Sequence, residues 1–294
     1  MEIRVLRYYL AVARELNITR AAESLHISQP SLSKQMMDLE DQIGKKLFIR
    51  GKRKIELTED GVLLKKRAEE IVELVQKTVD EMSQNTHVLS GDLYLGGTTT
   101  KKILKETAML IEKYPNIQLH FYSNDAVDIS ERLQHGLLDF AVMLEPIDTT
   151  KFNYLSLNDK TKWGVLMKKE SPYSKLDTIT PQELKTMPLI LHQRLGLQER
   201  LAHWAQIDLK DLKVQATYNV INRSNLELVR NNLGYLLATD DHLTKTLDED
   251  ICFKYLEPTL EESYALVWKK EATFSRVARA FYEQIKENKN GKSV

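Results

Sequence analysis

The sequence predicts three successive parts: a small all-α domain, one long helix, and a larger α/β portion. Residues 3–40 carry apolar side chains at helical spacing, interrupted by short turns. Residues 64–82 keep one apolar stripe flanked by charged residues, as in a long coiled-coil-like helix. From residue 91 onwards, strand-like and helix-like segments alternate, and this alternation favours an α/β fold.

Composition limits the class of protein. The chain has 294 residues, enough for two or three domains with their own cores. No apolar run approaches the roughly 18 residues that a membrane-spanning helix needs, and the N-terminus lacks the pattern of a signal peptide. The single cysteine, Cys252, leaves no intrachain disulfide and fits a reducing compartment. We therefore expect a cytoplasmic protein with no membrane partner.

Charge is unevenly distributed along a chain whose net charge is zero. Residues 1–58 hold eleven Lys or Arg against seven Asp or Glu, so the N-terminal part is basic. The stretch from Lys45 to Lys54 has six basic residues and no acidic one. Such a run is either a solvated loop or a phosphate-binding patch, and its position directly after the helices favours the patch.

The first helix is expected at Ile3–Glu15, where apolar residues recur at helical spacing. Thr19 is expected to cap a second helix, because its hydroxyl can accept a bond from an early backbone N–H. Ser28 is expected to cap a third helix, with Pro30 in the first turn, where a missing N–H is tolerated.

The third helix has two different faces. Leu32, Met36 and Leu39 fall on one side and are expected in the core, whereas Pro30, Ser33, Lys34 and Met37 fall on the other. Short and polar side chains near a helix start suit a DNA major groove, since hydroxyl, amide and ammonium groups can meet base edges and phosphates. The alternative is an ordinary solvent-facing side. The pattern predicts a recognition helix.

A β-hairpin is expected next. Leu47–Ile49 and Ile55–Leu57 read as two short strands joined by a basic turn around Gly51. This wing would bring four basic side chains to phosphates, and they are Arg50, Lys52, Arg53 and Lys54.

This N-terminal pattern resembles the DNA-binding domain of LysR-type transcriptional regulators, which typically show AA..L..SQP..S.....LE..G..LF.R......LT..G. The matching residues are Ala21, Ala22, Leu25, Ser28, Gln29, Pro30, Ser33, Leu39, Glu40, Gly44, Leu47, Phe48, Arg50, Leu57, Thr58 and Gly61. One position departs: the family commonly has Arg where this chain has Lys34, and lysine cannot make a two-pronged contact with guanine.

The resemblance implies a sequence-specific, DNA-binding transcriptional regulator that responds to a small-molecule effector. Its expected partners are a double-stranded DNA operator, a second or further copies in a homodimer or homotetramer, and RNA polymerase. The candidate DNA-contacting residues are Thr19, Arg20, Ser28, Gln29, Pro30, Ser31, Ser33, Lys34, Met37, Arg50, Lys52, Arg53 and Lys54.

The long helix is expected from Thr58, as its cap, to about Met82. Its apolar stripe fits a coiled-coil seam; the alternative is a single helix lying on its own domain. The resemblance implies a dimerising linker helix, with Leu64, Ala68, Ile71 and Val75 as candidate interface residues. The polar stretch 83–92 is the expected hinge.

Strands are expected in the α/β portion at 93–97, 117–123, 139–144, 163–167, 188–192, 213–220, 235–239 and 264–270, and helices at 101–114, 128–138, 197–206, 224–234 and 275–288. Thr180–Glu183 reads as a capping box, and Gly234 as the end of its helix. The resemblance implies two Rossmann-like subdomains, as in periplasmic binding proteins, with the effector between them.

The expected organisation is therefore a winged helix-turn-helix domain at 1–58, a linker helix and hinge at 59–90, and an effector-binding domain at 91–294. Within the last, subdomain I takes about 91–161 and 266–294, and subdomain II about 162–265.

Four polar segments follow strands and precede helices, where α/β sheets bind ligands. Each segment could equally be a helix cap or a loop. Together they form a candidate pocket for a small organic anion that bridges Thr99 and Thr100 to His192 or Arg194. The candidate effector-binding residues are Thr98, Thr99, Thr100, Ser123, Asn124, His192, Gln193, Arg194, Asn222, Arg223 and Ser224.

Enzyme chemistry has little support. The chain lacks the nucleophile elbow, zinc-protease, dinucleotide-binding and P-loop motifs. Its seven histidines have no metal-ligand spacing, and Cys252 lies in an apolar run that favours an inert thiol. We expect no cofactor, no metal and no catalysis. The alternative is an α/β enzyme or solute-binding module with an appended DNA-binding domain.

Overall fold

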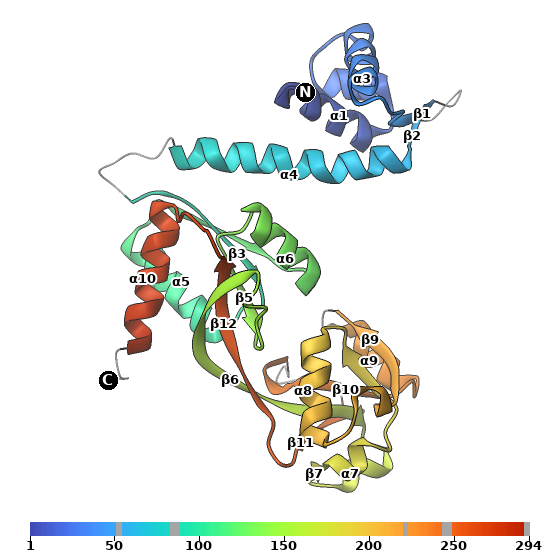
Figure 1. Cartoon of the computed structure of the whole chain (residues 1–294), viewed down its shortest axis with the longest axis vertical. Coiled ribbons are helices and arrows are strands. Elements are labelled where there is room, and N and C mark those ends of the chain that lie inside the picture. The colour runs from blue at the N-terminus through green and yellow to red at the C-terminus, as the bar shows by residue number, and fades with distance from the viewer. Residues whose placement is uncertain (51–54, 83–88, 220–222, 243–248, 291–294) are drawn as a thin grey trace. The chain divides into compact units, whose positions relative to one another are not determined.

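The computed structural model describes residues 1–50, 55–82, 89–219, 223–242 and 249–290. The chain divides into two compact units, Met1–His87 and Val88–Val294, and both are drawn in Figure 1. Among the described residues, no helix combines the length and the apolar character needed to cross a membrane.

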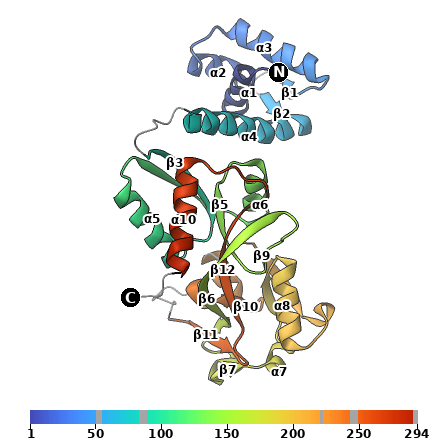
Figure 2. The same cartoon turned by 60° about the vertical axis from the view of Figure 1, so that its left-hand side comes forward.

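Unit 1 is a bundle of helices with one small hairpin (Figure 2). Its elements are α1 (Ile3–Glu15), α2 (Ile18–Ser24), α3 (Gln29–Ile43), β1 (Phe48–Arg50), β2 (Ile55–Leu57) and α4 (Glu59–Met82). The side chains predicted to face inward are buried: Leu32 and Met36 are 0% exposed and Leu39 is 1% exposed. β1 and β2 pair antiparallel, as the wing prediction required.

Two helix caps differ from the prediction. Asn17, not Thr19, caps α2, because its side-chain oxygen accepts a hydrogen bond from the backbone N–H of Arg20 at 3.1 Å. Thr19 lies inside the first turn of α2, so its expected role as a cap was wrong. Ser28 stands at the N-cap position of α3, but its side chain makes no capping bond. Thr58 caps α4 as expected, since its hydroxyl accepts from Gly61 N at 2.9 Å.

The first half of α4 packs on its own domain. Ala68 is 0% exposed, and Leu64 packs against the same core as α1 and α3. The alternative explanation of the apolar stripe therefore holds for these two residues. Ala68 is enclosed within unit 1 and cannot reach a partner, which corrects its assignment to a dimer interface.

Unit 2 begins with a mixed sheet that carries helices on both faces. Its elements are β3 (Gly91–Gly97), α5 (Lys101–Lys113), β4 (Ile117–Tyr122), α6 (Ala126–His135), β5 (Phe140–Leu144), the first half of β6 (Phe152–Lys168), β12 (Glu261–Lys269) and α10 (Arg276–Asn290). α5 and α10 lie side by side on one face (Figure 2), and α6 packs on the other.

The second subdomain repeats this layering. Its strands are the second half of β6, β7 (Thr178–Ile179), β8 (Leu189–His192), β9 (Val214–Tyr218), β10 (Tyr235–Thr239) and β11 (Ile251–Leu256). α7 (Pro181–Leu184) and α8 (Leu195–Ala205) pack on one face, and α9 (Arg223–Arg230) packs on the other. Single 3-10 turns are η1 (Pro172–Lys175), η2 (Leu209–Asp211) and η3 (Asp240–His242). The capping box at Thr180–Glu183 is present.

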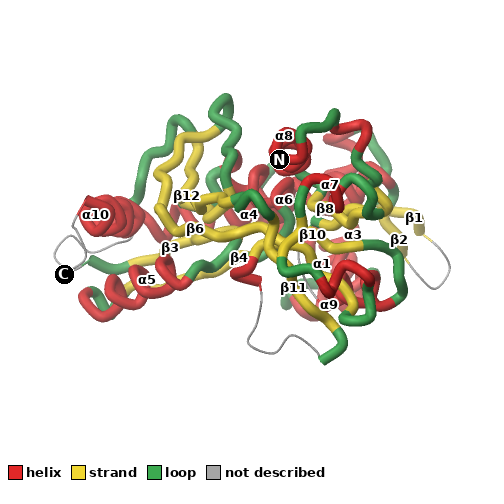
Figure 3. Tube along the Cα trace, turned by 90° about the horizontal axis from the view of Figure 1, so that it is seen from below, coloured by secondary structure: helices red, strands yellow, loops and turns green. Residues whose placement is uncertain are grey.

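β6 joins the two subdomains. Its first part pairs with β12 in the first subdomain, and its second part pairs with β10 and β11 in the second. The strand therefore belongs to the sheets of both subdomains (Figure 3). Only residues 163–167 of it were predicted. Residues 153–162 are mostly polar because much of this part is exposed or faces a cavity rather than a core, so the apolar signal is missing.

Gly234 does not end α9 as predicted. The helix stops at Arg230, and Asn232 takes the left-handed conformation with φ of +58°. Gly234 instead lies against the strand β8 region, where a Cβ would come within 2.6 Å of the Pro188 carbonyl oxygen. The glycine is needed for close approach of two backbones.

Candidate DNA-binding surface and effector cleft

The outward side of α3 is polar and accessible near its N-terminus. Gln29, Pro30, Ser31 and Lys34 are exposed, and Ser33 is half-buried. Met37 is 42% exposed one turn further along. The side opposite to these residues holds the buried Leu32, Met36 and Leu39, so α3 is anchored by one face and free on the other.

The neighbouring candidates lie around the start of α2 and α3. Thr19, Arg20 and Ser28 are exposed, and Arg20 also pairs with Glu15 at 3.4 Å. Arg50 belongs to β1, but its side chain lies outside the described residues, as do the predicted phosphate contacts Lys52, Arg53 and Lys54.

Further apolar side chains remain exposed on α4. Leu63 is 57% exposed, Ile71 36%, Leu74 40%, Val79 55% and Met82 82%. Ile71 and the half-buried Val75 are the two predicted interface residues that the core of unit 1 does not enclose. This stripe extends beyond the part of α4 that packs on the bundle.

A cavity of about 630 Å³ lies between the subdomains of unit 2. It is lined by Thr98, Thr99, Thr100, Ser123, Asn124, His192 and Arg194 among the predicted residues. Gln193 and Ser224 are exposed and do not line it. Asn222 and the side chain of Arg223 lie outside the described residues.

One side of the cavity is formed by the turn between β3 and α5. Thr100 caps α5, because its hydroxyl oxygen accepts from the backbone N–H of Ile103 at 3.3 Å, and the residue is 8% exposed. Thr98 and Thr99 are more accessible. Gly97 has φ of +87°, and a Cβ there would lie 2.3 Å from the Val142 carbonyl oxygen. The turn therefore presents hydroxyl groups and a helix N-terminus to the cavity, an arrangement that suits an anion.

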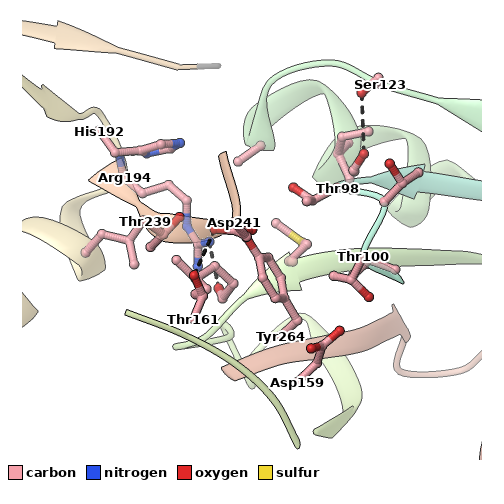
Figure 4. A pocket seen from close by; sticks show the side chains of 18 of the residues that line it. Thr98, Thr100, Ser123, Asp159, Thr161, His192, Arg194, Thr239, Asp241 and Tyr264 are labelled. Carbon is pink, nitrogen blue, oxygen red and sulfur yellow. Dashed lines mark hydrogen bonds between the residues drawn. The ribbon is translucent and has the colours of Figure 1, made fainter. Parts of the chain in front are cut away.

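The floor of the cavity is acidic, and it is visible in Figure 4. Thr161 Oγ1 lies 2.8 Å from Oδ1 of Asp240 and 2.8 Å from Oδ1 of Asp241. The Tyr264 hydroxyl donates to Asp241. Burial, followed by the nearby Asp241 carboxylate, raises the pKa of Tyr264 above its ordinary value, so the phenol stays protonated as a donor.

Two further polar atoms lie buried beside the cavity. Asp159 Oδ2 and the indole nitrogen of Trp163 have no hydrogen-bond partner among the described residues. Both residues line the cavity. Buried polar groups normally have a partner, so these two atoms are candidates for hydrogen bonds to a bound molecule.

Arg194 crosses from subdomain II to the end of β5. Its guanidinium donates to the carbonyl oxygens of Leu144 at 2.8 Å and Pro146 at 2.6 Å. Burial lowers the pKa of Arg194, and the nearby Glu262 carboxylate opposes that shift. A second crossing contact runs from the Asn219 amide to Asp125 at 3.3 Å. The two subdomains thus touch at the margins of the cavity.

His192 lines the cavity together with Arg194. Its Nδ1 accepts from the backbone N–H of Arg194 at 3.0 Å, which places a ring hydrogen, when neutral, on Nε2. The ring meets Tyr218 edge-on, with centroids 5.2 Å apart.

Sequence reasoning missed the acidic floor. Asp240 and Asp241 directly follow the strand β10, so the strand-end rule that selected Thr98 and His192 could have found them. Asp159, Thr161 and Tyr264 lie within β6 and β12. No local signal marks them, because only the pairing of these two strands brings them to the cavity.

Comparison with known proteins connects both units to one family. Residues 3–62 match the bacterial regulatory helix-turn-helix protein, lysR family, and residues 98–290 match the LysR substrate binding domain. The chain belongs to the LysR family. It is a DNA-binding transcriptional regulator whose activity is modulated by a small-molecule effector.

Relatives and solved structures agree with this assignment. The chain is 34% identical over 196 residues to the HTH-type transcriptional regulator BsdA of Bacillus subtilis, covering 65% of this chain and 67% of that protein. It is 36% identical over 169 residues to the Hca operon transcriptional activator HcaR of Escherichia coli, covering 54% and 55%. Full-length CbnR, solved with its target DNA, shares the fold with a TM-score of 0.74 at 20% identity, covering 98% and 99%.

Proposed function

We propose that this LysR-family regulator reads its operator with the exposed N-terminal half of α3. The observation that carries the proposal is the contrast between the two sides of that helix. Gln29, Pro30, Ser31, Ser33 and Lys34 form the accessible side, and their hydroxyl, amide and ammonium groups match base edges and phosphates. Thr19, Arg20 and Ser28 are exposed and are proposed to contact the flanking DNA backbone.

The wing is the proposed source of phosphate contacts that carry no sequence information. Arg50, Lys52, Arg53 and Lys54 belong to it by sequence. Residues 1–58 thus form the DNA-binding domain, 59–90 the linker helix and hinge, and 91–294 the effector domain, with subdomain I at about 91–161 and 266–294 and subdomain II at about 162–265. RNA polymerase remains a proposed partner of the DNA-bound form.

Dimerisation is proposed to use the exposed stripe of α4, because paired DNA half-sites need paired readers. Ile71, Leu74 and Val79 are exposed on this helix. Ala68 is excluded, since it is enclosed in unit 1, and Leu64 contributes to the same internal core.

The effector is proposed to be a small organic anion that also carries a hydrogen-bond donor. Its anionic group would lie at Thr98 and Thr99, where hydroxyl groups and the α5 N-terminus favour negative charge. Its donor would face the acidic floor at Asp159 and Asp241. The effector would bind one arrangement of the subdomains more tightly than another, and it would thereby shift the equilibrium between them. The protein is proposed to work by binding alone, without catalysis.

The test is a thermal-shift comparison of the full chain with matched acids, succinate with L-aspartate and glutarate with L-glutamate. A compound that binds the folded state raises the melting temperature by mass action. We expect the amino-bearing member of a pair to give the larger shift in the wild type. We also expect Asp241→Asn to remove that difference. Equal shifts within every pair, or no shift with any of the four acids, would count against this effector class.

A further inference from the structure

Glu40, in the last turns of α3, is the buried acidic residue of unit 1. Its side chain is 2% exposed. Its Oε1 accepts from the backbone N–H of Leu47 at 2.7 Å and of Phe48 at 3.2 Å, and Oε2 lies 3.4 Å from the Lys46 ammonium. Burial alone would raise the pKa of Glu40, but these donors lower it overall, so the carboxylate stays ionised at neutral pH. The end of the recognition helix thereby holds the residues that lead into β1.

Thr58 holds the same segment from the other side. Its hydroxyl donates to the carbonyl oxygen of Lys46 at 2.7 Å, and its backbone N–H donates to the carbonyl oxygen of Leu47 at 3.1 Å. The same hydroxyl accepts from Gly61 N at 2.9 Å at the start of α4. Segment 46–48 is therefore bonded to α3 through Glu40 and to α4 through Thr58. We call these residues (Glu40, Thr58 and segment 46–48) the clamp.

Two contacts fix the beginning of α4 against the clamp. A Cβ on Gly61 would lie 2.2 Å from the Leu47 carbonyl oxygen, so only glycine allows this approach. The buried Tyr9 hydroxyl donates to the carbonyl oxygen of Gly61 at 2.5 Å. α1, α3, the wing and α4 thus meet at one polar network, which is buried at Glu40 and Tyr9 and partly exposed at Thr58.

We propose that Glu40 and Thr58 are positioning residues for DNA binding, although neither side chain belongs to the proposed DNA surface. The clamp holds the wing and the linker helix in one fixed relation to the recognition helix. Both DNA-contacting elements must be in place together on the duplex, and any freedom between them would have to be lost on binding. The inference rests on the proposed DNA surface of α3 and the wing.

The direction in which DNA affinity changes when Glu40 is neutralised separates a positioning role from a purely electrostatic one. Glu40 is an anion within a DNA-binding unit, so its neutralisation alone would strengthen attraction to phosphates. Loss of positioning acts in the opposite direction. A neutral side chain of the same shape therefore distinguishes the two explanations.

The experiment measures binding of the full-length protein to double-stranded DNA, both a random 30-base-pair duplex and the tightest duplex selected from a random library. Variants are Glu40→Gln and its matched control Asp38→Asn, which makes the same charge change at an exposed position of α3. Thr58→Val and Thr58→Ser form a second pair, because serine restores the hydroxyl. Hydrogen exchange at the Leu47 and Phe48 amides reports the clamp directly, and thermal unfolding checks that each variant folds.

We expect Glu40→Gln and Thr58→Val to bind the selected duplex about tenfold more weakly than the wild type. Faster exchange at Leu47 and Phe48 should accompany the loss. Asp38→Asn should bind at least as tightly as the wild type, and Thr58→Ser should recover most of the affinity. If Glu40→Gln cannot fold, the Thr58 pair decides alone.

One result would overturn the clamp, and a different one would overturn the proposed DNA surface. Wild-type affinity in both Glu40→Gln and Thr58→Val, with DNA binding intact, would overturn the clamp while leaving the proposed function in place. A wild-type protein that shows no salt-dependent binding to either duplex would instead overturn the proposed DNA surface on which the clamp rests.

Discussion

At the scale of single residues, the carboxyl groups of unit 2 are held in unlike surroundings. Thr161 has one hydroxyl hydrogen but lies 2.8 Å from an oxygen of both Asp240 and Asp241, so it can donate to only one of them at a time. Glu262 is 7% exposed and accepts from the Arg200 guanidinium at 2.6 Å. Burial outweighs this partner and raises the pKa of Glu262.

The raised pKa of Glu262 predicts how stability depends on pH. A carboxyl group whose folded pKa exceeds its unfolded value near 4.5 binds its proton more tightly in the folded state. Its contribution is therefore fully present below pH 4.5 and is lost as the pH rises through the folded pKa. Glu262→Gln removes this titration. We expect urea unfolding from pH 4 to 8 to show a wild-type stability that declines relative to the variant; parallel curves would contradict the prediction.

Helix caps could be predicted from the sequence, because a capping side chain bonds to backbone groups only two or three residues away. Thr58 and Thr180 cap the helices expected of them. Thr19 did not, because α2 already begins at Ile18 and Asn17 holds the N-cap position, where its side-chain oxygen accepts from the backbone N–H of Arg20. Residues that only strand pairing brings to the cavity, such as Asp159 in β6 and Tyr264 in β12, had no such local signature.

At the scale of elements, α4 shows why an apolar stripe does not name its partner. Leu64 and Ala68 continue the same helical pattern as Ile71 and Val75, yet they pack into the core of unit 1. The helix is longer than the bundle surface that it covers. Its apolar residues are therefore part of the core of unit 1 near the N-terminal end and exposed further along. Periodicity predicted the helix correctly, whereas the division of its residues required the packed bundle.

The exposed part of α4 predicts an assembly defect. Ile71→Glu places a charge in the proposed interface, where burial without a partner is unfavourable. We expect this variant to be a monomer in light scattering. Gln76→Glu is the matched control, since it adds the same charge to another face of the helix, and it should keep the wild-type mass. An unchanged mass in Ile71→Glu would place the interface elsewhere.

β6 marks the limit of strand prediction. Its apolar second half, residues 163–167, was evident, but the polar first half pairs with β12 and carries Asp159 and Thr161 to the cavity. A strand that faces a cavity loses the alternation on which sequence reasoning depends. The polar first half of β6, which contributes to the candidate effector site, was therefore the part of this strand that the sequence did not reveal.

At the scale of the whole molecule, side-chain hydrogen bonds cross between the two subdomains of unit 2. Arg194 bonds the carbonyl oxygens of Leu144 and Pro146, and Asn219 bonds Asp125. β6 and β12 supply the continuous backbone between them. The proposed effector would lie among these contacts, and it would shift the relation of the subdomains by its differential affinity for two arrangements.

Arg194→Ala tests how much this crossing contact stabilises unit 2. Its removal leaves two carbonyl oxygens without their donors, and we expect a loss of about 1–3 kcal/mol in the free energy of unfolding. Arg200→Ala provides the comparison, because that residue pairs with Glu262 but makes no bond to β5 in the described residues. Urea unfolding of both variants gives the values. An Arg194→Ala protein as stable as the wild type would show that the crossing contact is dispensable.

α3 is proposed to read DNA sequence with the face that carries Ser33. The most direct measurement selects the tightest duplex from a random library and compares its affinity with that of a scrambled duplex at one salt concentration. We predict that the wild type prefers the selected duplex. Ser33→Leu should lose about 1–3 kcal/mol of binding to that duplex and little on the scrambled one. Gln42→Leu, an exposed position on the same helix outside that face, should retain the preference. An undiminished preference in Ser33→Leu would contradict base reading by this face of α3.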